Sequence, residues 1–219
     1  MSEIITVLLA DDHTLVRATL ADRLATETDL EVVAQVGNAD EAVSQCIQRQ
    51  PDIVLMDIDM PGLQCFEAAR TIQARCPNTR IVYLSAFLSD RYIEEALTVE
   101  AAGYVTKSEP PAAVIEAIHT AVAGRVYFSP EVRSRIVFDP KKGARLSSKQ
   151  PTRLSTLTQR ELQVLRYLAK GMSKKEIAHT INLSVSTVER HSDRLMKKLD
   201  IHDRVELARF AIREGLAEA

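Results

Sequence analysis

The first half of the chain alternates short apolar runs with segments of helical periodicity. Five runs rich in Val, Ile and Leu are short enough to be buried β-strands, and they lie at residues 5–10, 30–36, 52–57, 80–86 and 103–107. Between the first two runs, Leu15, Leu20 and Leu24 have the spacing of an amphipathic helix, and Val43 and Ile47 continue the pattern. This alternation predicts a parallel sheet covered by helices on both faces.

The pattern changes in the second half. A helix that starts at Pro110 and Pro111 and stops at Gly124 closes the first domain, which we place at residues 1–125. Periodicity then fades over residues 126–153, where Pro, Gly, Ser and basic residues accumulate, so this segment is expected to be a partly helical linker. Residues 154–219 are predicted to form a small all-α domain of four helices, at 158–169, 173–181, 184–199 and 204–214. Thr158 with Glu161 fits a capping box, and Gly171 and Asn182 stand where helices end.

The charge of the chain is divided in the same way. Among 219 residues, positions 1–140 hold 11 Lys and Arg against 21 Asp and Glu, a net charge of −10. Positions 141–149 add four bases and no acid, and positions 150–219 hold 13 bases against 9 acids, a net charge of +4. Two domains with different partners are indicated, and a polyanion suits the second.

The sequence disfavours a membrane or secreted protein, and it also disfavours a protein held together by disulfides or a cysteine metal site. No stretch approaches the roughly 18 apolar residues of a membrane span, and the first residues lack the basic region of a secretion signal, so we expect a cytoplasmic protein that does not contact membranes. Cys46, Cys65 and Cys76 are odd in number and lack metal-site spacing. They are expected to be reduced packing residues.

Polar side chains mark the ends of the predicted strands. Asp11 and Asp12 end the first strand, Asp57 the third and Ser85 the fourth, while Lys107 follows the fifth. In a doubly wound sheet these ends meet in one crevice, where ligands bind. Three carboxylates in one crevice require a counter-charge, and a hard divalent ion such as Mg²⁺ is the natural one. The hydroxyl and the ammonium suit a phosphoryl group.

The ordered motifs "LLADDH", "VLMDIDMPG", "YLSAF" and "GYVTKS" resemble the receiver domain of two-component response regulators, over residues 3–125. The resemblance implies a flavodoxin-like, five-stranded parallel sheet of order 2-1-3-4-5. It implies that Asp57 is phosphorylated by a sensor histidine kinase, that Asp11, Asp12 and Asp57 hold Mg²⁺, and that Ser85 and Lys107 bind the phosphoryl group. Ser85 and Tyr104 would form a switch in which Tyr104 turns inward after phosphorylation. No separate enzymatic substrate is expected.

Other interpretations of the same residues exist. Taken singly, the Asp11–Asp12 pair could cap a helix and Tyr104 could be half-buried packing. The stretch Asp57-Ile58-Asp59 also resembles the nucleophile motif of haloacid-dehalogenase-type phosphatases, but that family places its acidic metal pair late in the chain, and here the pair comes first. Asp59 and Phe87 depart from the commonest receiver pattern beside the path of water to the acyl phosphate, so the phosphoryl lifetime stays open.

The stretch "LTQRELQVLRYLAKGMSKKEIAHTINLSVSTVERHSDRLMKKL", residues 157–199, resembles the LuxR-type helix-turn-helix domain of NarL/FixJ-family response regulators. The resemblance implies that 184–199 is a recognition helix in double-stranded DNA and that the last helix supports a homodimer formed on phosphorylation. The expected DNA-contacting residues are Lys174, Lys175, Ser186, Thr187, Glu189, Arg190, Arg194, Lys197 and Lys198.

Two acids on that helix are unusual, because the family commonly has bases at Glu189 and Asp193. They could be solvated and paired, Asp193 with Lys197 and Glu189 with Arg190. Glu189 could instead read a cytosine amino group while Arg190 reads guanine. A third interpretation is that DNA binding is weakened or lost.

Three histidines are expected to bind no metal. His191 lies near the apolar face and should be a packed, hydrogen-bonded histidine, and neither His13 nor His202 has a partner at ligand spacing. The sequence thus indicates a phosphorylation-controlled transcription factor that changes domain arrangement and dimerisation. The alternative is a phosphorylation-switched protein-interaction module.

Overall fold

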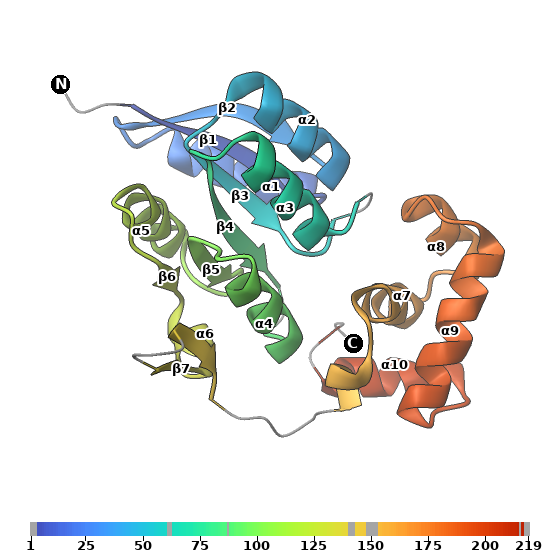
Figure 1. Ribbon diagram of the computed structural model, residues 1–219. Helices are drawn as coiled ribbons and strands as arrows, with labels where there is room; N and C mark the ends of the chain where they lie inside the picture. Colours follow the sequence, from blue (N-terminus) through green and yellow to red (C-terminus); the bar gives the residue numbers. More distant parts are fainter. Residues whose placement is uncertain are drawn as a thin grey trace. The chain divides into compact units, whose positions relative to one another are not determined.

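The computed structural model describes residues 4–60, 63–86, 88–139, 143–147, 153–214 and 216. The chain divides into two compact units, Met1–Ser148 and Lys149–Ala219 (Figure 1).

The first unit is a doubly wound α/β domain with six parallel strands in the order β2-β1-β3-β4-β5-β6. The strands are β1 (Ile5–Ala10), β2 (Leu30–Val36), β3 (Ile53–Asp57), β4 (Arg80–Ser85), β5 (Gly103–Thr106) and β6 (Tyr127–Phe128). The helices between them are α1 (Thr14–Leu24), α2 (Ala39–Arg49), α3 (Cys65–Arg75), α4 (Asp90–Thr98) and α5 (Pro111–Val122). The predicted fold class and the order of the first five strands are confirmed.

Burial explains why these segments take these positions. Every residue of β3 is buried, as expected for a central strand covered on both faces. Helix α1 contacts α5, and α2 contacts α3, so each face of the sheet carries helices. Leu20 and Leu24 of α1 face the core, but Leu15, which the helical spacing placed with them, is 80% exposed. Among the described residues, no helix is long and apolar enough to cross a membrane.

The segment after α5 differs from the expected linker. Tyr127 and Phe128 pair with Gly103 and Tyr104 as a sixth strand, and both side chains are buried. A short helix α6 (Pro130–Arg133) and an antiparallel pair, β7 (Ile136–Asp139) with β8 (Gly143–Leu146), follow within the first unit. Two-residue pairing leaves no periodic signal, and the hairpin is rich in the Pro, Gly and basic residues that indicate a loop.

The second unit is helical. It contains a 3-10 helix η1 (Arg153–Thr156) and the helices α7 (Gln159–Ala169), α8 (Lys174–Thr180), α9 (Val185–Leu199) and α10 (Arg204–Arg213). All four predicted α-helices are present, and the capping box of Thr158 with Glu161 is confirmed. A second capping box, Ser173 with Glu176, begins α8. Gly171 and Asn182 have positive φ, which suits the helix ends predicted there.

An ion pair between a buried carboxylate and an exposed lysine joins the start of α7 to the end of α9. The carboxylate of Glu161 is 2.6 Å from Nζ of Lys198, accepts a hydrogen bond from the backbone N–H of Thr158, and belongs to a residue that is only 2% exposed. Burial opposes its ionisation, yet the Lys198 ammonium and the Thr158 hydrogen bonds outweigh burial and lower the pKa of Glu161. This contact fixes α9 against the rest of the second unit.

Replacing Glu161 by Gln keeps the capping-box geometry but removes the charge that pairs with Lys198. We expect a loss of about 1–3 kcal/mol in the free energy of unfolding at pH 7. Because the folded state lowers the pKa of Glu161, its stabilisation is present above the unfolded pKa of about 4.3 and is lost as the pH falls through the folded pKa. Urea unfolding of the full chain, followed by circular dichroism at pH 7 and at progressively lower pH, measures this. The matched control is Glu176→Gln in the exposed second capping box, and an equal effect of both variants would contradict the role of the ion pair.

Candidate functional site

The predicted acidic residues meet at the carboxyl edge of the sheet. Asp11 and Asp12 follow β1, Asp57 ends β3, and one carboxylate oxygen from each lies within 4.8 Å of the others. Asp57 and Asp11 are buried, and Asp12 is partly exposed. The neighbouring positions of β1 and β3 in the sheet bring the three together, as the strand-end pattern predicts.

Lys107 supplies the positive charge of this cluster. Its Nζ is 2.7 Å from Oδ2 of Asp11 and 3.0 Å from Oδ2 of Asp57. The backbone N–H of Lys107 donates to the carbonyl of Ser85, which ties the end of β5 to the end of β4. Burial raises the pKa of Asp57 to about 6, against the lowering effect of Lys107. Burial alone would lower the pKa of Lys107, but Asp57 and Asp11 raise it, so the lysine stays charged.

His13 also belongs to the cluster, although the sequence analysis set it aside as a metal ligand because it found no partner at ligand spacing. Its Nδ1 is 2.8 Å from Oδ1 of Asp12 and 3.4 Å from Oδ1 of Asp11, and it lies within ligand distance of the three carboxylates. The only signal in the sequence is that His13 directly follows the acidic pair. Arg17, also not predicted, donates to the backbone carbonyl of Asp11.

The residues could hold a hard divalent cation. Oδ1 of Asp57 is buried and has no hydrogen-bond partner among the described residues, which is costly unless a ligand satisfies it. Oxygen ligands from Asp11, Asp12 and Asp57 match what Mg²⁺ prefers. The donor set therefore fits the predicted ion.

The expected switch residues lie next to this cluster. Ser85 and Tyr104 are both fully buried. Burial raises the pKa of Tyr104 above its ordinary range, and a hydrogen bond with Ser85 acts the other way. The inward position that the resemblance implied only after phosphorylation is thus already taken by Tyr104 here. The alternative interpretation, in which Tyr104 is a half-buried packing residue, does not fit either, because Tyr104 is fully buried.

Asp59 makes a contact with α4. Its Oδ1 accepts a hydrogen bond of 3.0 Å from the hydroxyl of Tyr92 in α4, a buried ring that packs against Phe66. Asp59 thereby joins the loop after β3 to α4. Phe87 lies outside the described residues.

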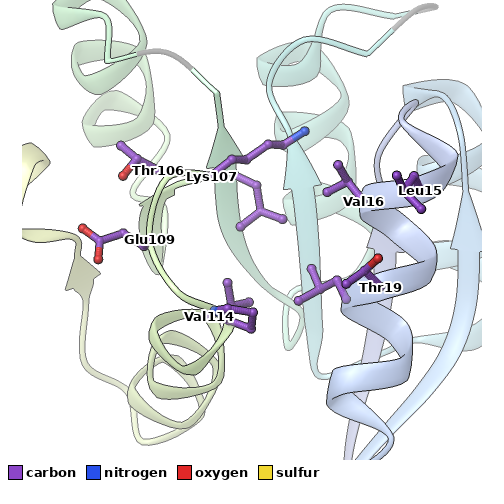
Figure 2. Close-up of a pocket in the computed structure, with 10 residues that line it drawn as sticks. Leu15, Val16, Thr19, Thr106, Lys107, Glu109 and Val114 are labelled. Atoms are coloured by element: carbon purple, nitrogen blue, oxygen red, sulfur yellow. The ribbon is translucent and has the colours of Figure 1, made fainter.

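An apolar pocket opens beside the acidic cluster. It has a volume of about 300 Å³ and lies between α1 and the start of α5, with Lys107 and Thr106 at its inner side. Figure 2 shows Leu15, Val16 and Thr19 on the α1 side and Val114 on the α5 side. Leu15 lines this pocket, so this apolar side chain of α1 borders the pocket and does not pack in the core.

In the second unit, α9 presents a polar face. Val188, Ser192, Leu195 and Leu199 are buried, which fixes the rotation of the helix. Val185, at the first position of the helix, is 37% exposed. The exposed residues of this face are Ser186, Glu189, Arg190, Asp193, Arg194 and Lys197. On α8, Lys175 is exposed and Lys174 is partly exposed. The hydroxyl of Ser184 caps the helix and contacts those of Ser186 and Thr187.

The ion pairs on this face differ from those expected. Glu189 lies 3.9 Å from Nζ of Lys174 on α8, whereas the sequence suggested Arg190 as its partner. Asp193 and Lys197 are both in the described part of the chain and form no ion pair there. Lys198 was predicted to contact DNA, but its ammonium is bound to Glu161 and to the carbonyl of Thr156.

His191 is half-buried, and its pKa is lowered, first by burial. Its Nδ1 has no hydrogen-bond partner among the described residues, so the expectation of a hydrogen-bonded core histidine is wrong at that atom. The prediction of packing came from the position of His191 near the apolar face of the helix.

Two protein families match these two units. The family described as the response regulator receiver domain matches residues 7–119, and the family described as bacterial regulatory proteins of the luxR family matches residues 155–211. Together these ranges leave only the termini and the segment between the domains unmatched.

Full-length relatives have the same arrangement. The chain is 34% identical to the transcriptional regulatory protein YxjL of Bacillus subtilis (strain 168), over 98% of both chains. It is 33% identical to the response regulator UvrY of Escherichia coli (strain K12), over 98% of this chain and 97% of that protein. A structure of RcsB from Salmonella enterica serovar Typhimurium, bound to promoter P1flhDC with the phosphomimetic BeF3-, has a TM-score of 0.66 at 21% identity, over 94% of this chain and 97% of RcsB. This last likeness is one of fold. The chain belongs to the response regulators of the NarL and LuxR type, in which a receiver domain precedes a LuxR-type helix-turn-helix domain.

Proposed function

We propose that this chain is a cytoplasmic transcription regulator that binds DNA under the control of phosphorylation at Asp57 by a sensor histidine kinase. The observation that carries the proposal is the placement of Asp57. Its carboxylate is buried, lies 3.0 Å from the ammonium of Lys107, and shares its crevice with Asp11 and Asp12. A carboxylate in that position is poised to take up a phosphoryl group, and no separate enzymatic substrate is required.

The transfer itself needs few protein groups. A carboxylate oxygen of Asp57 attacks phosphorus of the kinase phosphohistidine, the P–N bond breaks, and the electron pair stays on the imidazole nitrogen, which takes up a proton. The product is an acyl phosphate. Lys107 is placed to stabilise the charge on the transferred phosphoryl oxygens, and the hydroxyl of Ser85 stands at the neighbouring strand end.

We propose that Asp11, Asp12 and Asp57 hold Mg²⁺ in this site. A bound Mg²⁺ would neutralise charge on the carboxylates and on the phosphoryl oxygens during transfer. His13 beside Asp12 adds a partly exposed group at the edge of the cluster.

The pocket between α1 and α5 suits the kinase that donates the phosphoryl group. A donor histidine must come within bonding distance of Asp57, so the kinase must cover the surface around Lys107. The apolar side chains of Leu15 and Val16 border that surface and lie open to solvent. An exposed apolar patch of this kind marks a protein contact.

A chain of contacts leads from the phosphorylation site toward the segment before the second unit. The loop after β3 is tied to α4 through Asp59 and Tyr92. At the start of α4, Oδ1 of Asp90 is 2.7 Å from Nη1 of Arg135, the residue directly before β7. A shift of α4 after phosphorylation would therefore move the hairpin β7–β8, after which the chain continues to the DNA-binding unit.

The second unit supports binding to double-stranded DNA. Arg190, Arg194 and Lys197 are exposed on α9, and the hydroxyl cluster at its N-terminus can receive a phosphate. RcsB, a protein of the same fold, is seen bound to a promoter. Val205 and Ile212 of α10 are exposed apolar residues, which suit the proposed homodimer contact.

Replacing Asp57 by Asn removes the proposed nucleophile. We expect the wild-type chain, incubated with acetyl phosphate and Mg²⁺, to gain one phosphoryl group that hydroxylamine removes, and the variant to gain none. Mass spectrometry of the intact chain measures both, and removal of Mg²⁺ with a chelator should slow the wild-type reaction. Asp22→Asn, which changes an exposed acid of α1, is the matched control. Phosphorylation of the Asp57 variant at the wild-type rate would contradict the assignment.

Replacing the exposed Leu15 by Asp tests the kinase surface without disturbing the core. From a panel of purified sensor kinases, the kinase that phosphorylates the wild-type chain fastest is chosen as donor. We expect transfer from it to be about tenfold slower in the variant, because a charge replaces an apolar contact. Phosphorylation by acetyl phosphate should be unchanged, since that donor needs no docking surface. Ile47→Asp on α2 serves as control, and equal slowing with both donors would show damage to the site instead.

Replacing Lys197 by Ala tests the DNA surface. The logarithm of the DNA-binding constant falls linearly with the logarithm of the salt concentration, and each phosphate contact makes this slope steeper by about one. We expect the variant to lose about one from that slope and to bind all sequences more weakly, as measured by fluorescence anisotropy over a salt series. Lys170→Ala at the end of α7 removes the same charge elsewhere and should leave the slope unchanged. A wild-type slope near zero would favour the alternative function, a phosphorylation-switched protein-interaction module.

A further inference from the structure

The exposed face of α9 carries acids and bases in separate stripes. Glu189 and Asp193 lie four residues apart on one stripe, and Arg190, Arg194 and Lys197 form the neighbouring stripe. The buried residues Val188, Leu195 and Leu199 lock the helix in this rotation. Glu189 therefore cannot turn into the core, and whatever the helix meets must accommodate its carboxylate.

The position of Glu189 along the helix places it where bases are read. It lies in the second turn, five residues after the capping Ser184, and the N-terminal part of a recognition helix is the part that contacts base edges. The hydroxyls of Ser184, Ser186 and Thr187 mark the helix start as a phosphate contact, which would anchor that end of the helix at the groove.

A carboxylate in the major groove needs a hydrogen-bond donor. Cytosine presents its 4-amino group there, with no acceptor on the same base edge, whereas the adenine amino group stands beside the N7 acceptor, which repels a carboxylate. Guanine offers only acceptors and thymine an acceptor and a methyl group. Cytosine is thus the one base that a glutamate satisfies without a second, repulsive contact.

Lys174 makes this placement tolerable. Its ammonium, on the neighbouring helix α8, is 3.9 Å from the carboxylate of Glu189, which offsets repulsion from the DNA phosphates. The side chains of Lys174 and Glu189 are both exposed, so the carboxylate can accept a further hydrogen bond.

We propose that Glu189 is a specificity-determining residue that accepts a hydrogen bond from the 4-amino group of a cytosine in each half-site of the DNA. The inference rests on the proposed function, since it requires that α9 enters the major groove. Glu189 then changes which sequence is bound, while the neighbouring basic residues supply the affinity.

The test is a selection from a random double-stranded DNA library with the full chain in the presence of beryllofluoride and Mg²⁺. The wild-type chain should enrich a site with a fixed cytosine in each half. Glu189→Ala should enrich the same site with that one position randomised, and its affinity for unrelated DNA should not fall. Asp200→Asn, which removes an equal exposed charge at the end of α9 in a position that Asn tolerates, should keep the wild-type site.

A double-mutant cycle then identifies the contact. Replacing the selected cytosine by an analogue that lacks the 4-amino group should weaken wild-type binding by about tenfold or more and leave Glu189→Ala binding unchanged. If the wild-type chain selects a site and Glu189→Ala selects the identical site, the inference is overturned while the proposed DNA binding stands. If the wild-type chain enriches no site and shows no salt-dependent binding, the proposed function fails and takes this inference with it.

Discussion

The receiver unit is organised around one ammonium group among carboxylates. Asp11 and Asp57 repel each other in a buried crevice, and Lys107 offsets that repulsion through contacts of 2.7 and 3.0 Å. The three residues come from the ends of β1, β3 and β5, so the ion pairs also hold the carboxyl edge of the sheet together. Any change in the charge of Asp57 alters the balance on which this edge depends, and the edge carries Ser85 and the loop toward α4.

In the second unit, too, cationic side chains hold separate segments together. Lys198 joins α9 to Glu161 at the start of α7, and Arg153 of η1 donates to the carbonyl of Leu199 while its guanidinium lies 5.8 Å from the ring of Phe210. Both cations fix the C-terminal end of α9. The N-terminal end remains free to present its hydroxyls and mixed charges, which is the end expected to meet base edges.

The sequence predicts most of what depends on strong local signals. Buried runs of Val, Ile and Leu predict the five main strands, and the polar residues at their ends predict the acidic cluster that the structure brings together. Weak or non-local features were missed. Strand β6 is two residues long, Leu15 has core-like spacing but lines a pocket, and the ion pair between Lys198 and the buried Glu161 joins residues 37 positions apart in the sequence. Such contacts arise only when distant segments are brought together by packing.

We propose that phosphorylation at Asp57 controls DNA binding by the second unit. The affinity of the full chain for its selected site is to be measured with and without beryllofluoride and Mg²⁺, at one fixed salt concentration. We expect tighter binding with beryllofluoride, and no such change in the Asp57→Asn variant. Equal affinities in the two states, from a wild-type chain shown to bind beryllofluoride, would contradict it.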